Sequence, residues 1–356
     1  MENEISLSKN LEREKSTDYI TFVIIVSAFA VITLHTNGFF WFYTGKEDYW
    51  FSANIIECVF YFAVPLFFMV SGITLMDFFD RYPLKTYFFK RFKKTMVPFF
   101  FWSLVAIAID LYTGKRLWSN IDLRSVYQAI TGNKVVSFYW FFFSLFGLYI
   151  CMPLFAAVEK SKRKLVFSYL FFAALLFNIT LPFLKRVFGS DLNVFLSVPV
   201  QAGYLIWPLL GWLLHNSELT RKHKIVIYVL GAIGLGLHIG GTYVLTTEAG
   251  RVVPKFKGYE GLPSVLYSIS VFVLLKDVGS WIMRNERLAK IVKVLGSYAF
   301  EIYLLQFILL NAVARIPAID RSSLVYRLGA PFVMIPIIIL FTWCLRKIPI
   351  LRKVVP

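Results

Sequence analysis

Charged residues are scarce in this sequence. Only 17% of the 356 residues are charged, 58% are hydrophobic, and the mean hydropathy is +0.65. A soluble globular chain is about one quarter charged, so this one has too little polar surface to cover a soluble fold of its size. The composition excludes an ordinary soluble domain and favours a protein whose main solvent is lipid.

Cysteine is also rare, and its spacing excludes two kinds of site. Cys58, Cys151 and Cys344 lie in separate apolar runs without Cys-x-x-Cys or Cys/His spacing, so neither a disulfide framework nor a zinc site is expected. The sequence contains no P-loop, no GxGxxG at a strand–helix junction, no HExxH and no GxSxG. We therefore expect no metal and none of the common soluble active sites.

Acidic residues are outnumbered by basic ones, 21 against 38, which gives a formal net charge of +17. This excess does not indicate a nucleic-acid partner, because Lys and Arg form short clusters between apolar runs and not a stripe with exposed aromatics. A cleavable signal peptide is not expected either. Residues 1–18 are polar, and no small-residue cleavage site follows the first apolar run.

Long apolar runs dominate what is present. A bilayer core about 30 Å thick is crossed by about 20 apolar residues in a helix. Strands are excluded, because an open sheet edge cannot be satisfied in lipid. We therefore predict an all-α, polytopic membrane protein, a single bundle of about ten transmembrane helices. The predicted segments are 20–42, 53–79, 95–113, 138–158, 165–184, 194–215, 225–247, 262–276, 289–313 and 323–345.

The distribution of positive charge predicts the orientation. With the N-terminus inside, the cytoplasmic segments and adjoining helix ends hold 25 of the 38 Lys and Arg, and the opposite orientation would leave 13 inside. We expect both termini in the cytoplasm. The predicted organisation is a cytoplasmic segment 1–19, a transmembrane domain 20–345 and a cytoplasmic tail 346–356.

Ionisable residues inside spanning helices are costly and tend to mark function. Four of them stand out: His35, Glu57, His238 and Glu301. His35 ranks first, because about fifteen residues at 1.5 Å each place it in the outer half of the bilayer, where a neutral imidazole could accept a proton from an alcohol. Glu57 could orient His35, carry a second proton or be solvated at the interface. A buried His35 that only bonds a neighbouring helix is the structural alternative, and we expect Glu301 to be structural.

A basic segment, 80–94, precedes the third predicted helix. Lys90, Arg91 and Lys94 are among its cations, and Arg91 and Lys94 would share one helix face and could hold one phosphate group together. The positive-inside rule alone would also place such a cluster there.

Several segments, read in order, resemble the acyltransferase-3 family of bacterial membrane O-acyltransferases. Asp18 precedes the first helix and His35 lies toward its end. The further segments are FFMVSGITL at 67–75, YFFKRFKKTMVPFFFW at 87–102, YWFFFSLFGLYICMPLF at 139–155, HIGGTYVLTTEAG at 238–250, EGLPSVLYSISVFVLLK at 260–276 and LGSYAFEIYLLQ at 295–306. The likeness covers nearly the whole chain.

The resemblance implies an activity and a set of site residues. The family transfers an acyl group, usually acetyl, from cytosolic acyl-CoA to an outward-facing sugar or lipid-linked glycan. His35 would be the essential histidine, as general base or acyl relay. From its position alone, and not from the resemblance, we add Glu57 as a second catalytic candidate. Lys90, Arg91, Lys94 and Ser71 would bind acetyl-CoA, whose pantetheine arm would thread into the bundle. We place acceptor contacts at His238 and Trp140, and expect a multi-pass protein of the bacterial cytoplasmic membrane.

The sequence departs from the family pattern at three places. Lys94 stands where the family has a second arginine, Gln306 replaces a histidine, and the Arg or Lys usually found directly after Asp18 is absent. Two alternatives stay open: a transporter or flippase for a glycan or lipid-linked substrate, and a catalytically inactive acyltransferase-like protein. The transporter alternative lacks the related halves and broken helices typical of that class.

Overall fold

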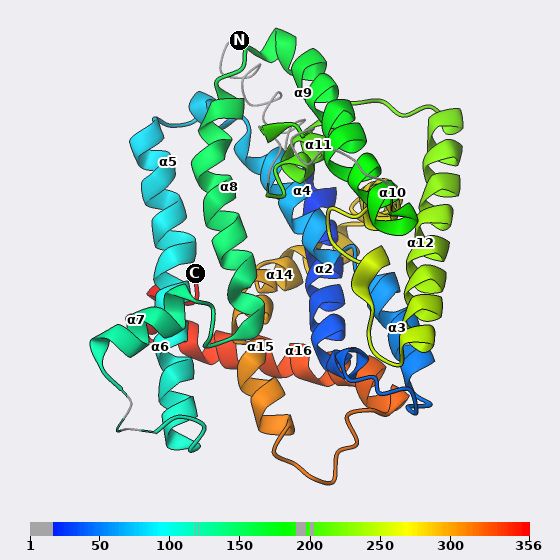
Figure 1. Cartoon of the computed structure of the whole chain (residues 1–356). Helices are drawn as coiled ribbons and strands as arrows, with labels where there is room; N and C mark the ends of the chain where they lie inside the picture. Colours follow the sequence, from blue (N-terminus) through cyan, green and yellow to red (C-terminus); the bar gives the residue numbers. More distant parts are fainter. Residues whose placement is uncertain (1–16, 118, 120, 190–196, 200–202) are drawn as a thin grey trace. The chain divides into compact units, whose positions relative to one another are not determined.

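The computed structural model describes residues 17–117, 119, 121–189, 197–199 and 203–356. Over these residues the chain is helical and contains no strand, which confirms the all-α fold (Figure 1). Eight helical stretches of the described residues, some of them made of consecutive helices, are long and apolar enough to span a membrane, or nine if one bent pair counts as a single span. The predicted count of ten is therefore not confirmed, and the orientation stays a prediction.

The helices begin and end as follows: α2 Tyr19–Thr36, α3 Trp50–Phe60, α4 Ala63–Leu75, α5 Leu84–Arg91, α6 Val97–Tyr112, α7 Leu123–Thr131, α8 Trp140–Ala156, α9 Lys160–Ala174, α10 Leu181–Phe188, α11 Ile206–His215, α12 Arg221–Ala249, α13 Leu262–Ile282, α14 Glu286–Gly296, α15 Ala299–Val313 and α16 Leu324–Arg346. Two π-helical segments, Phe92–Met96 and Leu175–Thr180, join α5 to α6 and α9 to α10.

Several predicted boundaries are wrong. The first helix does not reach residue 42 but ends at Thr36, because Asn37 leaves the helical region and Gly38–Trp41 forms a 3-10 turn. The basic segment 80–94 is largely helical, so the third span runs from Leu84 to Tyr112. The many lysines of this segment lower its hydropathy, so the sequence did not show that the segment continues into the third span.

Three further predicted segments also differ. The ninth, 289–313, is broken into α14 and α15, which meet at a 52° bend. In the sixth, 194–215, only α11 is helical among the described residues, and 194–196 and 200–202 lie outside them, as do residues 1–16 of the predicted N-terminal segment. The predicted loop 114–137 contains α7, whose start is fixed by a capping box between Asp122 and Ser125.

Both π segments have the same local feature. Each ends two residues before a proline, Pro98 in α6 and Pro182 in α10. Proline lacks the N–H that would bond to residue i−4, and its ring clashes with that carbonyl. A wider π turn just before the proline relieves the clash without ending the span.

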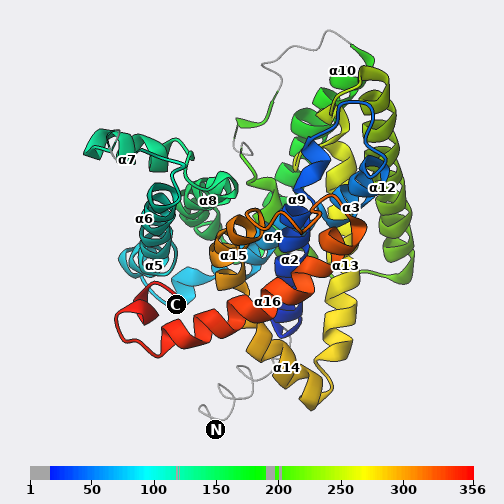
Figure 2. The same cartoon turned by 90° about the horizontal axis from the view of Figure 1, so that it is seen from below.

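The chain forms two compact units. Unit 1 consists of the described residues of Met1–Ile73, Lys164–Phe300 and Arg321–Pro331. In it α12 packs along α13 and against α3, and α2 packs against α13 and α14, as Figure 2 also shows. Helices α4 and α11 cross closely: a Cβ at Gly72 would lie 1.9 Å from the Pro208 carbonyl oxygen. Only glycine allows this approach.

Unit 2 consists of Thr74–Arg163, Glu301–Asp320 and Phe332–Pro356. Buried tyrosines tie its helices together: the Tyr87 hydroxyl donates to the Tyr149 carbonyl at 3.1 Å and the Tyr139 hydroxyl to the Leu304 carbonyl at 2.7 Å. The Arg163 guanidinium donates to Asp77 at 2.5 Å and also to the Ala156 and Val158 carbonyls, which fixes the start of α9. These contacts position the cationic segments described next.

Candidate functional sites

Unit 2 contains a strongly basic cavity of about 880 Å³, here called the basic cavity. Seven of its twelve lining residues are cations and none of the described side chains in its wall is acidic. The cations are Arg81, Lys90, Arg91, Lys93, Lys94, Arg352 and Lys353. A concave surface with so many cations concentrates a positive field and favours an anionic ligand.

Three of the predicted donor-binding residues, Lys90, Arg91 and Lys94, line this cavity together. Arg91 ends α5, while Lys94 lies in the π segment, so they are not held on one α-helical face as expected. The structure nevertheless brings both to the same wall. The Nε atom of Arg91 is buried, with no hydrogen-bond partner among the described residues.

Aromatic rings help to hold the cations of this wall. Lys90 Nζ lies 4.0 Å from the ring centre of Tyr82, and the Arg81 guanidinium lies 5.6 Å from the same ring. The Arg91 guanidinium lies 5.8 Å from the Tyr149 ring. Cation–π contacts of this kind stabilise a cation by about 0.5–2 kcal/mol. They offset part of the repulsion between neighbouring cations.

Unit 1 contains a buried polar cluster at the C-terminal end of α2, here called the α2-end cluster: Asn37, Glu57, Lys257 and Arg327. They are exposed by no more than 4%. Lys257 Nζ donates to Glu57 Oε1 at 3.1 Å, the Asn37 amide lies 3.5 Å from Glu57 Oε2, and Arg327 donates to Asn37 Oδ1 at 3.3 Å. The contacts connect an α3 carboxylate to cations from two distant segments.

His35 lies in the last turn of α2, beside this cluster in sequence, and is half-buried. Its neighbour Thr36 donates its hydroxyl to the Arg327 carbonyl at 2.9 Å, and Asn37 donates its amide to the Ala53 carbonyl at 2.8 Å. The backbone that carries His35 is thus fastened on two sides. The Glu57 carboxylate contacts Lys257 and Asn37.

His238 is fully buried on α12, and its ring lies edge-on to that of Tyr61 at 5.1 Å. Among the described residues, neither ring nitrogen has a hydrogen-bond partner, and the hydroxyl of Thr242, one turn further on, also has none. Buried polar groups are nearly always paired with protein or with ordered water, so these two groups have unused hydrogen-bonding capacity.

The other predicted site residues lie elsewhere. Ser71 donates its hydroxyl to the Phe67 carbonyl at 3.0 Å, within α4 of unit 1, and Trp140 begins α8 in unit 2, half-buried. Glu301 is an acceptor for Arg346 at 2.9 Å, as a structural residue would be.

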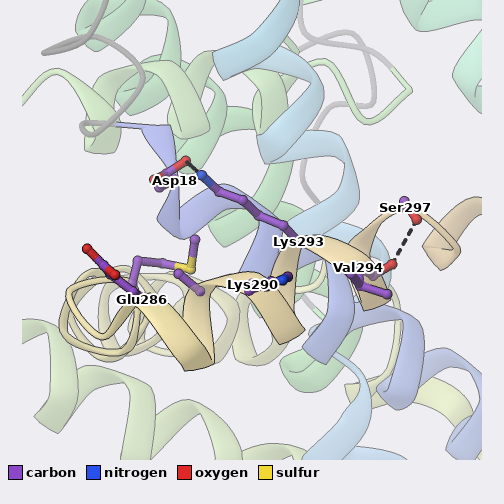
Figure 3. Close-up of a pocket in the computed structure, with 8 residues that line it drawn as sticks. Asp18, Glu286, Lys290, Lys293, Val294 and Ser297 are labelled. Carbon is purple, nitrogen blue, oxygen red and sulfur yellow. Dashed lines mark hydrogen bonds and ion pairs between the residues drawn. The ribbon is translucent and has the colours of Figure 1, made fainter.

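Asp18 lines a second cavity, of about 620 Å³, in unit 1 (Figure 3). Its carboxylate pairs with Lys293 of α14 at 3.2 Å, and Glu286 and Lys290 also line the wall. Two acids and two lysines nearly balance in charge. This cavity therefore lacks the strong preference for anions that marks the basic cavity.

Within the described part of the chain, no group of three or more His, Cys, Asp or Glu side chains is arranged to hold a metal ion. The sequence analysis missed Lys257, Arg327, Arg352 and Lys353. Arg327 had a usable signal, because it lies within the predicted segment 323–345 and ionisable residues in such segments mark function. Lys257 lies in a predicted loop, and Arg352 and Lys353 lie in the predicted cytoplasmic tail, where basic residues are ordinary.

Comparison with known proteins gives one match. A protein-family model described as an acyltransferase domain matches residues 18–346, which is nearly the whole chain. Neither a curated protein nor a solved structure matches.

Proposed function

The chain belongs to the acyltransferase-3 family of membrane acyltransferases. We propose that it moves an acetyl group from cytosolic acetyl-CoA to a hydroxyl of an extracytoplasmic or lipid-linked glycan. The family match over residues 18–346 is the observation that carries this proposal. The basic cavity supports it, because the donor carries its negative charge on phosphate groups.

The donor is proposed to bind with its phosphates in the basic cavity. Arg91 and Lys94 offer a guanidinium and an ammonium to one phosphate group, with Lys90 beside them. Charge-assisted hydrogen bonds to phosphate are about twice as strong as neutral ones. That Ser71 binds the donor stays a prediction, and so does a contact between Trp140 and the acceptor.

His35 is proposed to act as the base. It takes the proton of the acceptor hydroxyl while the hydroxyl oxygen attacks the thioester carbon. The new C–O bond forms, the C–S bond breaks, and the proton passes from the imidazolium to the leaving thiolate. Transfer through an acyl-histidine would use the same residue in two steps.

Glu57 is proposed as a positioning residue. Its carboxylate contacts Asn37, which follows α2 directly after the turn that carries His35. It would act on the orientation of the imidazole and not on the proton itself. His238 and Thr242 are proposed to bind the acceptor through their buried, unpartnered polar atoms.

The test is thiol release and acetyl transfer by the purified protein in detergent. We expect His35→Ala to lose about 10²–10⁴-fold in kcat, the usual contribution of a general acid–base group. His223→Ala is the matched control, because His223 is exposed in the first turn of α12, and it should leave the rate unchanged.

A folded His35→Ala protein with undiminished transfer would remove the catalytic assignment. Absence of thiol release from the wild type, together with movement of a glycolipid across vesicles, would favour the transporter alternative. Mass spectrometry of surface glycans from cells with and without the gene would identify the acceptor.

A further inference from the structure

The C-terminal segment Lys347–Pro356 is a folded part of unit 2. The Trp102 indole donates to the Val354 carbonyl at 2.9 Å, and Arg346 donates to the Pro356 carbonyl at 2.9 Å. Val354 and Val355 are buried. The short 3-10 turn Leu351–Lys353 directly precedes these anchored residues. The segment is therefore held in place before any ligand arrives.

This anchoring sets two cations in the wall of the basic cavity. Arg352 and Lys353 are exposed and line this cavity together with the cations of segment 81–94, which lie far away in the sequence. They lie beyond residue 346, where the family match ends. The cavity thus has a part that the family match covers, and a part that only this segment supplies.

Coenzyme A has two separate anionic groups, a diphosphate and a ribose 3′-phosphate. The 3′-phosphate is a monoester, and a phosphomonoester carries a charge of about −1.5 to −2 at pH 7. Two cationic clusters from different segments suit two separated anionic groups better than one. An arginine adds a planar fork of donors and a lysine a compact point charge.

We infer that Arg352 and Lys353 bind the 3′-phosphate of the donor, and so select CoA thioesters over donors that lack this group. The inference rests on the proposed function. Arg91 and Lys94 then bind a phosphate group of the diphosphate. Arg352 and Lys353 are specificity-determining residues, distant from the reacting thioester, so they act on KM and not on the chemical step.

The test compares two donors, acetyl-CoA and 3′-dephospho-acetyl-CoA, with the full chain in neutral detergent. Free thiol release is measured at varied donor concentration. We expect the wild type to prefer acetyl-CoA by about tenfold in kcat/KM, the size of one charge-assisted interaction at an exposed site. Arg352→Gln/Lys353→Gln should lose about tenfold with acetyl-CoA through KM and nothing with the dephospho donor.

Two controls guard the result. Lys347→Gln removes a cation from the same segment outside the cavity wall, where its Nζ lies 4.8 Å from the Trp343 ring, and it should keep the donor preference. Arg352→Lys/Lys353→Arg keeps both charges and should restore most of the preference. Elution as a single folded species verifies each variant.

Equal loss with both donors, or a wild type without preference, would overturn the inference and leave the proposed function intact. A phosphate of a lipid headgroup is the competing source of the same chemistry. If anionic phospholipid in the micelles changes activity through Arg352 and Lys353 while donor preference stays constant, the inference is also overturned. No thiol release from either donor in the wild type would instead contradict the proposed function itself.

Discussion

The most informative perturbation of the fold is Lys257→Met in the α2-end cluster. Lys257 comes from the segment between α12 and α13, is exposed by only 3%, and pairs with Glu57 at 3.1 Å. Its Nζ also lies 4.4 Å from the ring centre of Phe40 and 4.3 Å from that of Tyr61. Methionine keeps the apolar stem and removes the charge.

The magnitude follows from what the substitution leaves behind. Removing one partner of a buried ion pair destabilises a protein by about 3–5 kcal/mol, because the other charge stays buried without compensation. We therefore expect Lys257→Met to lower the free energy of unfolding by about 3–5 kcal/mol. Adding Glu57→Gln removes the stranded charge, so the double variant should recover about 1–3 kcal/mol relative to additivity.

The assay is reversible unfolding in mixed micelles, followed by tryptophan fluorescence. Lys160→Met is the matched control, since Lys160 pairs with Asp80 at 2.5 Å but both side chains are largely exposed, at 62% and 39%. An exposed pair contributes about 0–1 kcal/mol. The reasoning is refuted if Lys257→Met costs no more than Lys160→Met, or if the double variant is simply additive.

Three further outcomes are expected. Gly72→Ala should prevent normal folding because its Cβ would overlap the Pro208 carbonyl, whereas Gly240→Ala, with open space around it, should yield normal amounts of folded protein in the same detergent extraction. Burial raises the pKa of Glu260, although the hydrogen bond from the Tyr204 N–H lowers it, so the folded state holds this proton more tightly than the unfolded state. The stability that this group contributes therefore falls as the pH rises through the raised pKa. Glu260→Gln should raise the melting temperature at pH 7 and not at pH 4, and a gain of equal size at both would contradict the assignment. Lys94→Arg restores a bidentate fork in the basic cavity and should lower the KM for acetyl-CoA several-fold at constant kcat, while Lys85→Arg, outside the cavity wall, should change nothing.

Hydropathy and charge predicted much of the fold, because both are local properties. Runs of about 20 apolar residues predict spanning helices wherever they lie in the chain. The same rule failed where a span contains charged residues or proline. The lysines of 85–94 made the start of the third span look polar, so its start was predicted too late. Pro98 and Pro182 did not predict the π turns that precede them.

The candidate sites were only partly predictable for a similar reason. Arg91 and Lys94 could be joined from their spacing, and they do line one cavity. No spacing rule places Arg352 in the same cavity, because its position depends on how the last segment is anchored by Trp102.

By itself, the sequence determined that this is an all-helical chain suited to lipid, with a histidine near the end of its first helix and a cationic segment at the start of its third. Only the tertiary structure decided which charges meet. Glu57 is stabilised by a lysine 200 positions away, and the basic cavity is completed by the final residues of the chain. Apolar patterning acts over a few turns of helix, whereas ion pairing needs contact within a few ångströms, and only packing brings distant segments that close.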